Sequence, residues 1–412
     1  MTTAGSGVSG ESDLTPQPPL PQERGSQNAL APDASRAGGE KRWRALLDWI
    51  RDRYPPLPPA RKDRASRVAF WVVVAMAAAF VLFFTLFLWA RQDAFQTNAE
   101  DLGIMDQALW NTLHGAILHQ TICNSVSDVN CLGDVSRLGI HFEPIMFPIS
   151  LLYLIAPSPK TLQLLQALVV AAGAFPAFWI GSRRLGSNIA GVVFAGVYLL
   201  YPALQAATVY DFHAVTLSAA FLMFALYFML TRNDLGLVIA CVLALATKEN
   251  IVADVGMIGL SIGLLQRRWR TGGTLIALTV VWLVVELLIM RHFSPLGHSP
   301  TASRYAYLGK GPVSAAKTIL THPAQILRQH VFDAGGVHYL RVLLAPSAYL
   351  PLLSPLTLAI AIPSLGVNLL SSEPLMREGI YQYNANIVPV LVLASIESVY
   401  WLAALGGWLA AR

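Results

Sequence analysis

Charged residues are scarce in this sequence, and their scarcity limits what the chain can be. Asp, Glu, Lys and Arg together make up 13% of the 412 residues, whereas hydrophobic residues make up 55%. One soluble core of this size cannot accommodate so much apolar material, which excludes a soluble globular protein. The sequence instead predicts an all-α polytopic integral membrane protein.

The start of the chain lacks both apolar runs and the features of a leader. Residues 1–20 have neither the basic patch nor the apolar run with which a cleaved signal peptide begins. Residues 1–40 are rich in Gly, Ser, Pro and Ala, and cannot bury enough apolar surface to offset the cost of ordering. We expect residues 1–65 to be a disordered cytoplasmic tail, either inert or carrying a protein-binding proline segment, and residues 66–412 to form one membrane domain.

Apolar windows long enough to cross a bilayer recur along the rest of the chain. About 20 apolar residues, each rising about 1.5 Å, cross a hydrocarbon layer of about 30 Å. Several windows are short, and the fifth and sixth are candidates for half-spans that meet inside the protein. We expect ten spans, near residues 69–90, 161–182, 188–209, 214–231, 235–247, 250–266, 273–292, 338–353, 355–371 and 387–410.

Positive charge is unevenly distributed around these windows. Nine Lys and Arg residues lie between positions 41 and 67, whereas the long segment after the first window is mainly acidic. Positive flanks stay in the cytoplasm, so we expect both termini inside and the protein in the cell inner membrane. This orientation requires that the apolar piece 144–156 does not span, so we expect an interfacial or re-entrant helix there, after an external loop over residues 91–143.

The same orientation collects the unusual polar groups on the external face. Intervening cytoplasmic loops are short and contain little besides Arg. Acids, imidazoles and tyrosines gathered at one interface indicate a protein that handles a substrate there. The external motifs are EDLGIMDQ at 100–107, GIHFEP at 139–144, YDFH at 210–213, SRYAYLG at 303–309 and EPLMREGIYQYN at 373–384.

Two acids of the first motif, Asp101 and Asp106, are candidates for chemistry. Asp101 precedes a helical stretch and could instead stabilise the positive end of that helix. Asp106 has Ile104, Leu109 and Trp110 around it, so its carboxylate needs a partner. On a helix the two acids would point about 140° apart, so they do not make a simple two-carboxylate face.

His141 and Glu143 lie two residues apart in the second motif. Together with Asp101, Asp211 and His213 from other loops they could ligate a divalent metal. No local spacing demands a metal, and the alternative is a hydrogen-bonded cluster that shapes an outer cavity.

Lys248 and Glu249 interrupt an apolar run. Each ionised group at membrane depth costs roughly 2.5 to 3.5 kcal/mol unless it is paired or hydrated. The pair could be an ion pair at a helix break, or Lys248 could reach a phosphate that Glu249 helps to position. Arg304 and Arg377 are further external cations able to bind an anionic head group through two parallel hydrogen bonds.

The sequence has three cysteines. Cys123 and Cys131 lie eight residues apart in the external loop, where oxidation can join them, and CNSVSDVNC contains turn-forming residues that could close the ring. We expect this disulfide. Cys241 lies in an apolar window and is expected only to pack.

Five fragments of the chain resemble one family. They are DLGIMDQALWNTLHG, HFEPI, LLYPALQAATVYDFH, ATKEN and SRYAYLG, in that order. Over about residues 95–390 the chain is similar to the bacterial membrane family Domain of Unknown Function 2079, which is grouped with the C-type glycosyltransferases. These multi-span enzymes use lipid-phosphate-linked sugars and have an acidic motif in the first external loop, where Asp101 matches.

The resemblance also has loose and missing matches. His141 to Pro144 is only similar to the HPP-like sequence that follows the loop in that superfamily. The family tends to have a His before the Tyr of the last external motif, whereas here Gln382 precedes Tyr383. We assign Gln382 no acid or base role.

The resemblance implies a reaction and a role for each candidate residue. Glycosyl transfer needs a group that takes the acceptor proton, and donors or cations that stabilise the polyprenyl phosphate as it leaves. The implied roles are Asp101 as base, Asp106, His141 and Glu143 on the acceptor side, Lys248, Glu249, Arg304 and Arg377 at the phosphate, and Asp211, His213 and Tyr305 around the sugar. Tyr383 is a further substrate-binding candidate.

Two other functions compete with the enzyme. A transporter or flippase would carry polar groups through the full depth of the membrane. The cytoplasmic halves of most windows are apolar, and Gly or Pro breaks do not repeat in two halves, so the enzyme is favoured. The third function is a non-catalytic scaffold that binds a lipid-linked glycan or other membrane proteins.

Overall fold

The computed structural model describes residues 56–61, 63–122, 135–297 and 299–410. The chain divides into two units, Met1–Arg53 and Tyr54–Arg412, and all described residues belong to the second. The expected disulfide between Cys123 and Cys131 lies outside the described residues, as does most of the expected tail. Leu57, within that expected tail, is buried and donates its backbone N–H to Leu230 O at 3.1 Å.

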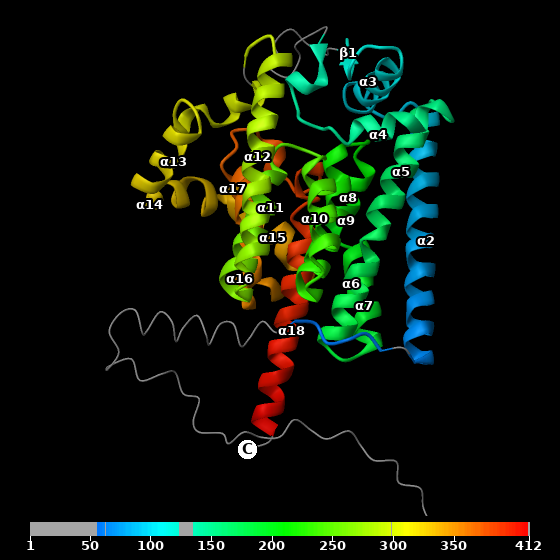
Figure 1. Ribbon diagram of the computed structural model, residues 1–412, viewed down its shortest axis with the longest axis vertical. Coiled ribbons are helices and arrows are strands. Elements are labelled where there is room, and N and C mark those ends of the chain that lie inside the picture. Colours follow the sequence, from blue (N-terminus) through cyan, green and yellow to red (C-terminus); the bar gives the residue numbers. More distant parts are fainter. Residues whose placement is uncertain (1–55, 62, 123–134, 298, 411–412) are drawn as a thin grey trace, which may run out of the picture. The chain divides into compact units, whose positions relative to one another are not determined.

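The second unit is a helical membrane domain (Figure 1). Its described part has five helical stretches long and apolar enough to cross a membrane. A sixth results if α7 and α8, which are bent by 44° at their junction, count as one span. These stretches are α2 (Arg64–Asp93), α5 with α6 (Pro159–Ala172 and Ala174–Arg184), α9 (Ala214–Thr231), α12 (Trp269–Phe293) and α18 (Val388–Ala410), and the bent pair is α7 (Asn188–Leu199) with α8 (Pro202–Val209).

The expected ten spans are therefore not confirmed, although an all-α membrane protein is. The remaining apolar windows form helices too short to cross: a 12-residue helix is about 18 Å long, well short of about 30 Å of hydrocarbon. Proline is the first or second residue of several of the short pieces, because it fixes φ and donates no backbone hydrogen bond. The short pieces are α10 (Asp234–Leu245), α11 (Ile251–Gln266), α15 (Ala334–Leu344), η6 (Ala345–Ser347), η7 (Leu350–Leu353), α16 (Pro355–Leu358), η8 (Ala359–Ala361) and α17 (Ile362–Leu369).

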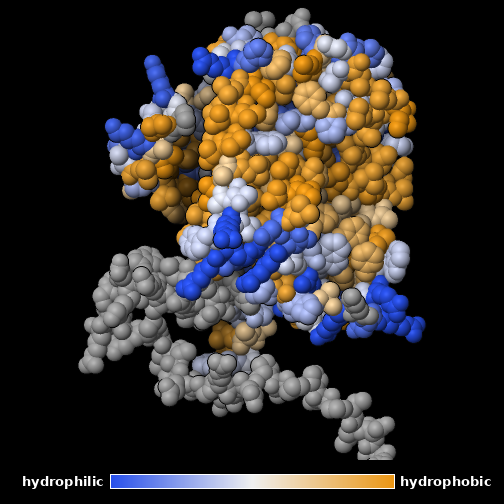
Figure 2. Space-filling model, viewed as in Figure 1, coloured by the Kyte–Doolittle hydropathy of each residue, from blue (hydrophilic) through white to orange (hydrophobic). Residues whose placement is uncertain are grey.

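The core forms around α9, which packs against α5, α6, α10 and α18. α9 and the first half of α18 are buried on almost every side, whereas α2 and α12 expose large apolar side chains such as Phe83 and Leu288. Figure 2 shows the resulting apolar belt, with hydrophilic residues gathered at its two ends. Such a belt suits contact with lipid.

Glycine lets two pairs of helices approach closely. A Cβ on Gly181 of α6 would lie 3.2 Å from Gly191 Cα of α7, and a Cβ on Gly272 of α12 would lie 2.6 Å from Gly259 O of α11. Membrane helices associate through such small-residue contacts, because lipid supplies no hydrophobic force between them. Larger side chains here would separate the pairs.

A layer of short elements connects α2 to α5 at one end of the bundle (Figure 1). The apolar piece 144–156, expected to be interfacial or re-entrant, forms only α4 and η3. A small core that includes Leu109, Phe142 and Phe212 fixes the layer to the start of α9. We call it the loop layer; it contains η1 (Ala99–Gly103), α3 (Ile104–Leu113), β1 (His119–Gln120), antiparallel β2 (Val135–Ser136), η2 (Arg137–Gly139), α4 (Met146–Ser150) and η3 (Leu151–Leu154).

A second irregular region follows α12, and Figure 1 shows α13 and α14 to the side of that helix. It returns to the bundle through η10, which precedes α18. The elements are η4 (Pro300–Leu308), α13 (Pro312–Thr321), α14 (Pro323–Ile326), η5 (Leu327–Val331), η9 (Pro374–Arg377) and η10 (Gln382–Asn384).

Candidate functional site

Asp101 lies in η1, a single π-helical turn that the segment between α8 and α9 holds in place. Asn98 begins this turn: its side chain accepts from Glu100 N, and its own backbone N–H donates to Asp211 Oδ2 at 2.7 Å. Asp211 is buried directly before α9. Its carboxylate therefore anchors the turn that carries Asp101.

Two side chains donate to the Asp101 carboxylate. Tyr210 Oη lies 2.8 Å from Oδ2, and His213 Nε2 lies 3.2 Å from Oδ1. The His213 backbone N–H donates to Gln166 Oε1, and its ring stacks on Tyr210 with centroids 5.5 Å apart. Burial raises the pKa of Asp101, but the hydrogen bonds and charge of His213 and the Tyr210 hydroxyl outweigh it and lower the pKa below its usual value. Asp101 is thus ionised at neutral pH.

Asp106 has a different partner, the Tyr153 hydroxyl, at 2.6 Å. Burial raises the pKa of Asp106 above its usual value. The two acids of the first motif therefore differ in environment and face different neighbours. Only Asp101 is close to the groups contributed by YDFH.

His141 and Glu143 diverge after η2. His141 Nδ1 lies 2.7 Å from Glu249 Oε1, and the Phe142 backbone N–H donates to the other Glu249 oxygen at 3.2 Å. Glu143 is buried and accepts from Arg137 Nε at 2.5 Å and Nη2 at 3.3 Å. Burial raises the pKa of Glu143, but Arg137 outweighs it and lowers the pKa. Both Glu143 oxygens are thus occupied within the protein.

Six of the candidate residues line one small cavity, although they lie up to 242 positions apart, between His141 and Tyr383. We call it the loop-end cavity. Its volume is about 60 Å³, room for a few waters or one phosphate-sized group at roughly 10–15 Å³ of this measure per water. The six are His141, Lys248, Glu249, Arg304, Tyr305 and Tyr383, and Asn250, Asn368 and Met376 also line it.

The cavity lies where the short α10–α11 hairpin meets the loop layer. Ile145, directly before α4 of the loop layer, donates its backbone N–H to Ala246 O at 2.9 Å. This bond joins the loop layer to the tip of the hairpin. Lys248 Nζ lies 5.8 Å from the centroid of the Tyr383 ring, a cation–π contact. Arg304 Nη1 makes a weak contact with Met376 Sδ at 3.7 Å, and the Arg304 side chain also hydrogen-bonds Tyr383. Two cations therefore line a cavity whose carboxylate, Glu249, is already bonded to His141.

Tyrosine rings connect Asp101 with this cavity. The Tyr210 ring, whose hydroxyl contacts Asp101, meets the Tyr381 ring edge-on with centroids 4.8 Å apart. Tyr381 in turn lies 6.5 Å from Tyr383, which lines the cavity. The ionised acid and the two cations thus belong to one continuous polar and aromatic region.

The remaining candidates lie outside the cavity lining. Arg377 Nη1 pairs with Asp333 Oδ2 at 3.3 Å. Asp106 and Asp211 bond Tyr153 and Asn98, and Gln382 is buried at the start of η10. The sequence predicted one site. In the structure the candidates divide into the loop-end cavity, the acid motif beside it, and the separate ion pair of Arg377 with Asp333.

Metal ligation has no support among the described residues. No group of three or more His, Cys, Asp and Glu there could hold a metal ion. Asp101 and His213 do meet, but the Asp211 carboxylate bonds Asn98 instead of joining them. The described candidates instead form hydrogen bonds among themselves and with their neighbours.

Sequence reasoning missed the partners Tyr210, Tyr153 and Arg137. Tyr210 opens YDFH, so its motif was the available signal. Arg137 precedes Glu143 by six residues, a spacing with no meaning until η2 turns the chain. Tyr153 lies in the apolar piece 144–156, where its hydroxyl was the only indication that it could bond an acid.

Comparison with known proteins gives a family. A family model described as "Predicted membrane protein (DUF2079)" matches residues 91–408, a stretch that includes Asp101 and every residue of the loop-end cavity. No curated protein matches the chain.

Proposed function

We propose that this chain, which belongs to the DUF2079 family of predicted membrane proteins, moves a sugar from a polyprenyl-phosphate donor to an acceptor at the outer face of the membrane. It would act in the inner membrane with both termini in the cytoplasm. One observation carries the proposal: Lys248 and Arg304 line a phosphate-sized cavity that tyrosine rings connect to the ionised Asp101.

The reaction needs a place for the phosphate, and the loop-end cavity suits it. Arg304 has no carboxylate partner among the described contacts. Lys248 lies over the Tyr383 ring and also interacts with the charges of Glu249 and Glu143. Those two carboxylates are already bonded to other side chains. As the bond from the anomeric carbon to the phosphate oxygen breaks, its electron pair stays on the phosphate. The two cations would stabilise that charge in a site with little water.

The reaction also needs a base, which we assign to Asp101. The acceptor hydroxyl attacks the anomeric carbon, and its proton passes to a carboxylate within hydrogen-bond reach. The lowered pKa keeps Asp101 ionised and able to accept a proton at neutral pH. His213 and Tyr210 would orient the carboxylate, so both are positioning residues in this proposal.

The cavity volume sets a condition on the donor. About 60 Å³ accommodates a phosphate but not the attached sugar as well. In this proposal the sugar lies toward Tyr381 and Asp101, and the polyprenyl chain lies in the surrounding lipid. Binding would require η4 or η9, which carry Arg304 and neighbouring Met376, to move outward.

A transporter or flippase remains the second candidate, favoured by a line of buried polar groups. Asn368 lines the cavity and donates to Tyr339 Oη at 2.8 Å, and Tyr339 donates to Asn384 Oδ1 at 2.7 Å. Farther along, Asp254 accepts from Ser364 and Asn386. Buried polar groups in a membrane protein often mark a path for polar substrates or protons. Here these polar side chains form hydrogen bonds with one another.

One reconstitution separates the two candidates. The purified protein is placed in vesicles with a labelled polyprenyl-phosphate sugar and a hydroxyl acceptor, and both labelled product and labelled donor on each leaflet are measured. Transfer that is lost in Lys248→Met and Arg304→Gln, without donor crossing, supports the enzyme. Donor crossing without any labelled product would overturn it in favour of the flippase.

A further inference from the structure

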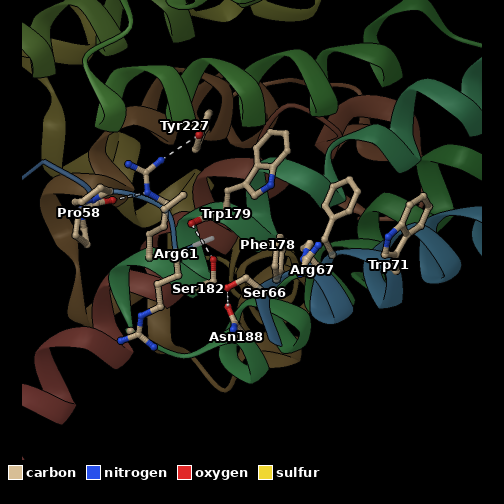
Figure 3. A pocket seen from close by; sticks show the side chains of 15 residues that line it. Pro58, Arg61, Ser66, Arg67, Trp71, Phe178, Trp179, Ser182, Asn188 and Tyr227 are labelled. Carbon is tan, nitrogen blue, oxygen red and sulfur yellow. Dashed lines mark hydrogen bonds between the residues drawn. The ribbon is translucent and has the colours of Figure 1, made fainter. Parts of the chain in front are cut away.

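A second pocket lies at the start of α2, at the other end of that helix from the loop layer. Its volume is about 570 Å³. We call it the arginine pocket. Figure 3 shows Arg67 and Trp71 coming from α2, Trp179 and Ser182 from α6, and Tyr227 from α9. Residues 58–61 complete one wall.

The wall formed by residues 58–61 is held in place by backbone contacts. The preceding residue, Leu57, is buried and bonded to Leu230 O. Arg183 Nε donates to Pro58 O at 2.5 Å, and Arg183 Nη1 donates to Tyr227 Oη at 3.0 Å. Arg183 is therefore engaged in building the pocket and is not available to a ligand.

Two other arginines are available. Arg61 and Arg67 are exposed, and neither side chain donates a hydrogen bond to the described residues. Among the described residues, those that line the pocket include these two and Arg183 but no Asp or Glu. Asp63, close by in the sequence, accepts from Ser66 N at the start of α2, and its charge interacts with that of Arg61. One carboxylate does not balance three arginines. The pocket therefore has an excess of positive charge.

The other walls are aromatic and continue onto the apolar surface. Phe70, Trp71, Phe178 and Trp179 line the pocket, and Trp71 is 66% exposed. From Val68 onward α2 presents apolar side chains to the belt. Aromatic rings at the end of a membrane helix lie at the level of lipid head groups. Free guanidinium groups beside such rings suit a molecule with an anionic head and apolar chains.

We propose that the arginine pocket binds an anionic phospholipid. Arg61 and Arg67 bind its phosphate by charge-assisted hydrogen bonds, which planar guanidinium groups form well. Its acyl chains follow Phe70 and Trp71 onto the surface of α2. A soluble phosphate compound would gain nothing from those rings, so continuity with the apolar belt favours the lipid. This inference is independent of the proposed sugar transfer.

The test compares two double variants of the full-length protein in mild detergent. Arg61→Gln with Arg67→Gln removes both free arginines. The matched control, Arg64→Gln with Arg270→Gln, removes two exposed arginines from the starts of α2 and α12 that do not line the pocket. Native mass spectrometry measures the affinity for phosphatidylglycerol, with phosphatidylcholine of the same chains as the neutral lipid.

We expect the wild type and the control to prefer phosphatidylglycerol and the pocket variant to bind it about 30-fold more weakly, the effect of two cations near a lipid surface. A photoreactive phosphatidylglycerol should label residues 58–71 or 178–188 in the wild type, a result that does not depend on any variant folding. Equal weakening in both double variants would overturn the proposal, as would equal affinity for the two lipids. Displacement of the lipid by excess inorganic phosphate would mean that a soluble phosphate is the occupant.

Discussion

The loop-end cavity and the arginine pocket hold their charges in opposite ways. Around the cavity, the charged groups are partly or fully buried and bonded to one another: His141 bonds Glu249, and Glu143 bonds Arg137. In the arginine pocket the two free cations are exposed in a volume roughly nine times larger, about 570 Å³ against about 60 Å³. Fixed, enclosed charges suit a reacting group, because they need no reorganisation during the reaction. Exposed cations among aromatic rings suit a ligand that is bound without reacting.

The largest expected effect would come from the acid beside the cavity. Asp101→Asn retains the shape but removes the basic oxygen, so sugar transfer in the vesicle assay should fall by about 10² to 10⁴. Asp93→Asn is the control, because Asp93 is 66% exposed and, in the part of the chain that the structure describes, pairs only with Lys160. Transfer by Asp101→Asn at the rate of this control would show that the base lies elsewhere.

The buried pair of the loop layer should matter for stability rather than for chemistry. Glu143→Gln leaves the Arg137 guanidinium buried without its counter-charge, so the free energy of unfolding should fall by about 3 to 5 kcal/mol. Thermal unfolding in detergent measures it. The double variant Arg137→Met with Glu143→Leu removes both charges and should recover most of the loss. No recovery would mean that the pair is needed for more than neutralisation.

The cation lining the cavity should differ from the cation outside it. Arg304→Gln should weaken transfer by roughly 10- to 150-fold, corresponding to a charge-assisted hydrogen bond of about 1.5 to 3 kcal/mol. Arg377→Gln should have little effect on transfer, because Arg377 pairs with Asp333 and does not line the cavity. If both variants lose the same activity, the phosphate site extends to η9.

The smallest expected effect has opposite signs for the two acids of the first motif. The pKa of Asp101 is lowered on folding, so its ionised form stabilises the fold. This stabilisation builds up as pH rises from the lowered pKa to the ordinary Asp pKa of about 3.9, and it is fully present above that value. The pKa of Asp106 is raised, so its ionisation destabilises the fold, and this loss builds up as pH rises from about 3.9 to the raised pKa. Relative to wild type, Asp101→Asn should lose stability as pH rises and Asp106→Asn should gain it, measured by denaturation at a series of pH values.

Hydropathy located the helices well but not their lengths. The apolar windows coincide with helices from α2 to α18, because lipid or core burial demands apolar side chains in either case. Whether a window crosses depends on where the chain breaks, as between Leu199 and Pro202. Such breaks are set by tertiary contacts as well as by proline.

Motifs selected residues that meet, but not the bonds between them. Six candidates line the loop-end cavity because polar groups in an apolar chain are rare and must find one another or water. Their pairing was not predictable: His141 and Glu249 are 108 positions apart in the chain. The hydrogen-bond partner of Glu143 was not predictable either, because only the turn at η2 brings Arg137 to it.

The shortness of α10 affects how this chain can be inserted into a membrane. With 12 residues, it cannot stand alone as a crossing segment, and lipid-exposed irregular backbone at its tip would leave polar groups without partners. We therefore expect the hairpin of α10 and α11 to stay beside α9 during synthesis until α12 packs against α11 and residue 145 bonds its tip. Biogenesis of this region would then be cooperative: an acid motif made early in translation acquires its neighbouring cations only after the following helices have been inserted.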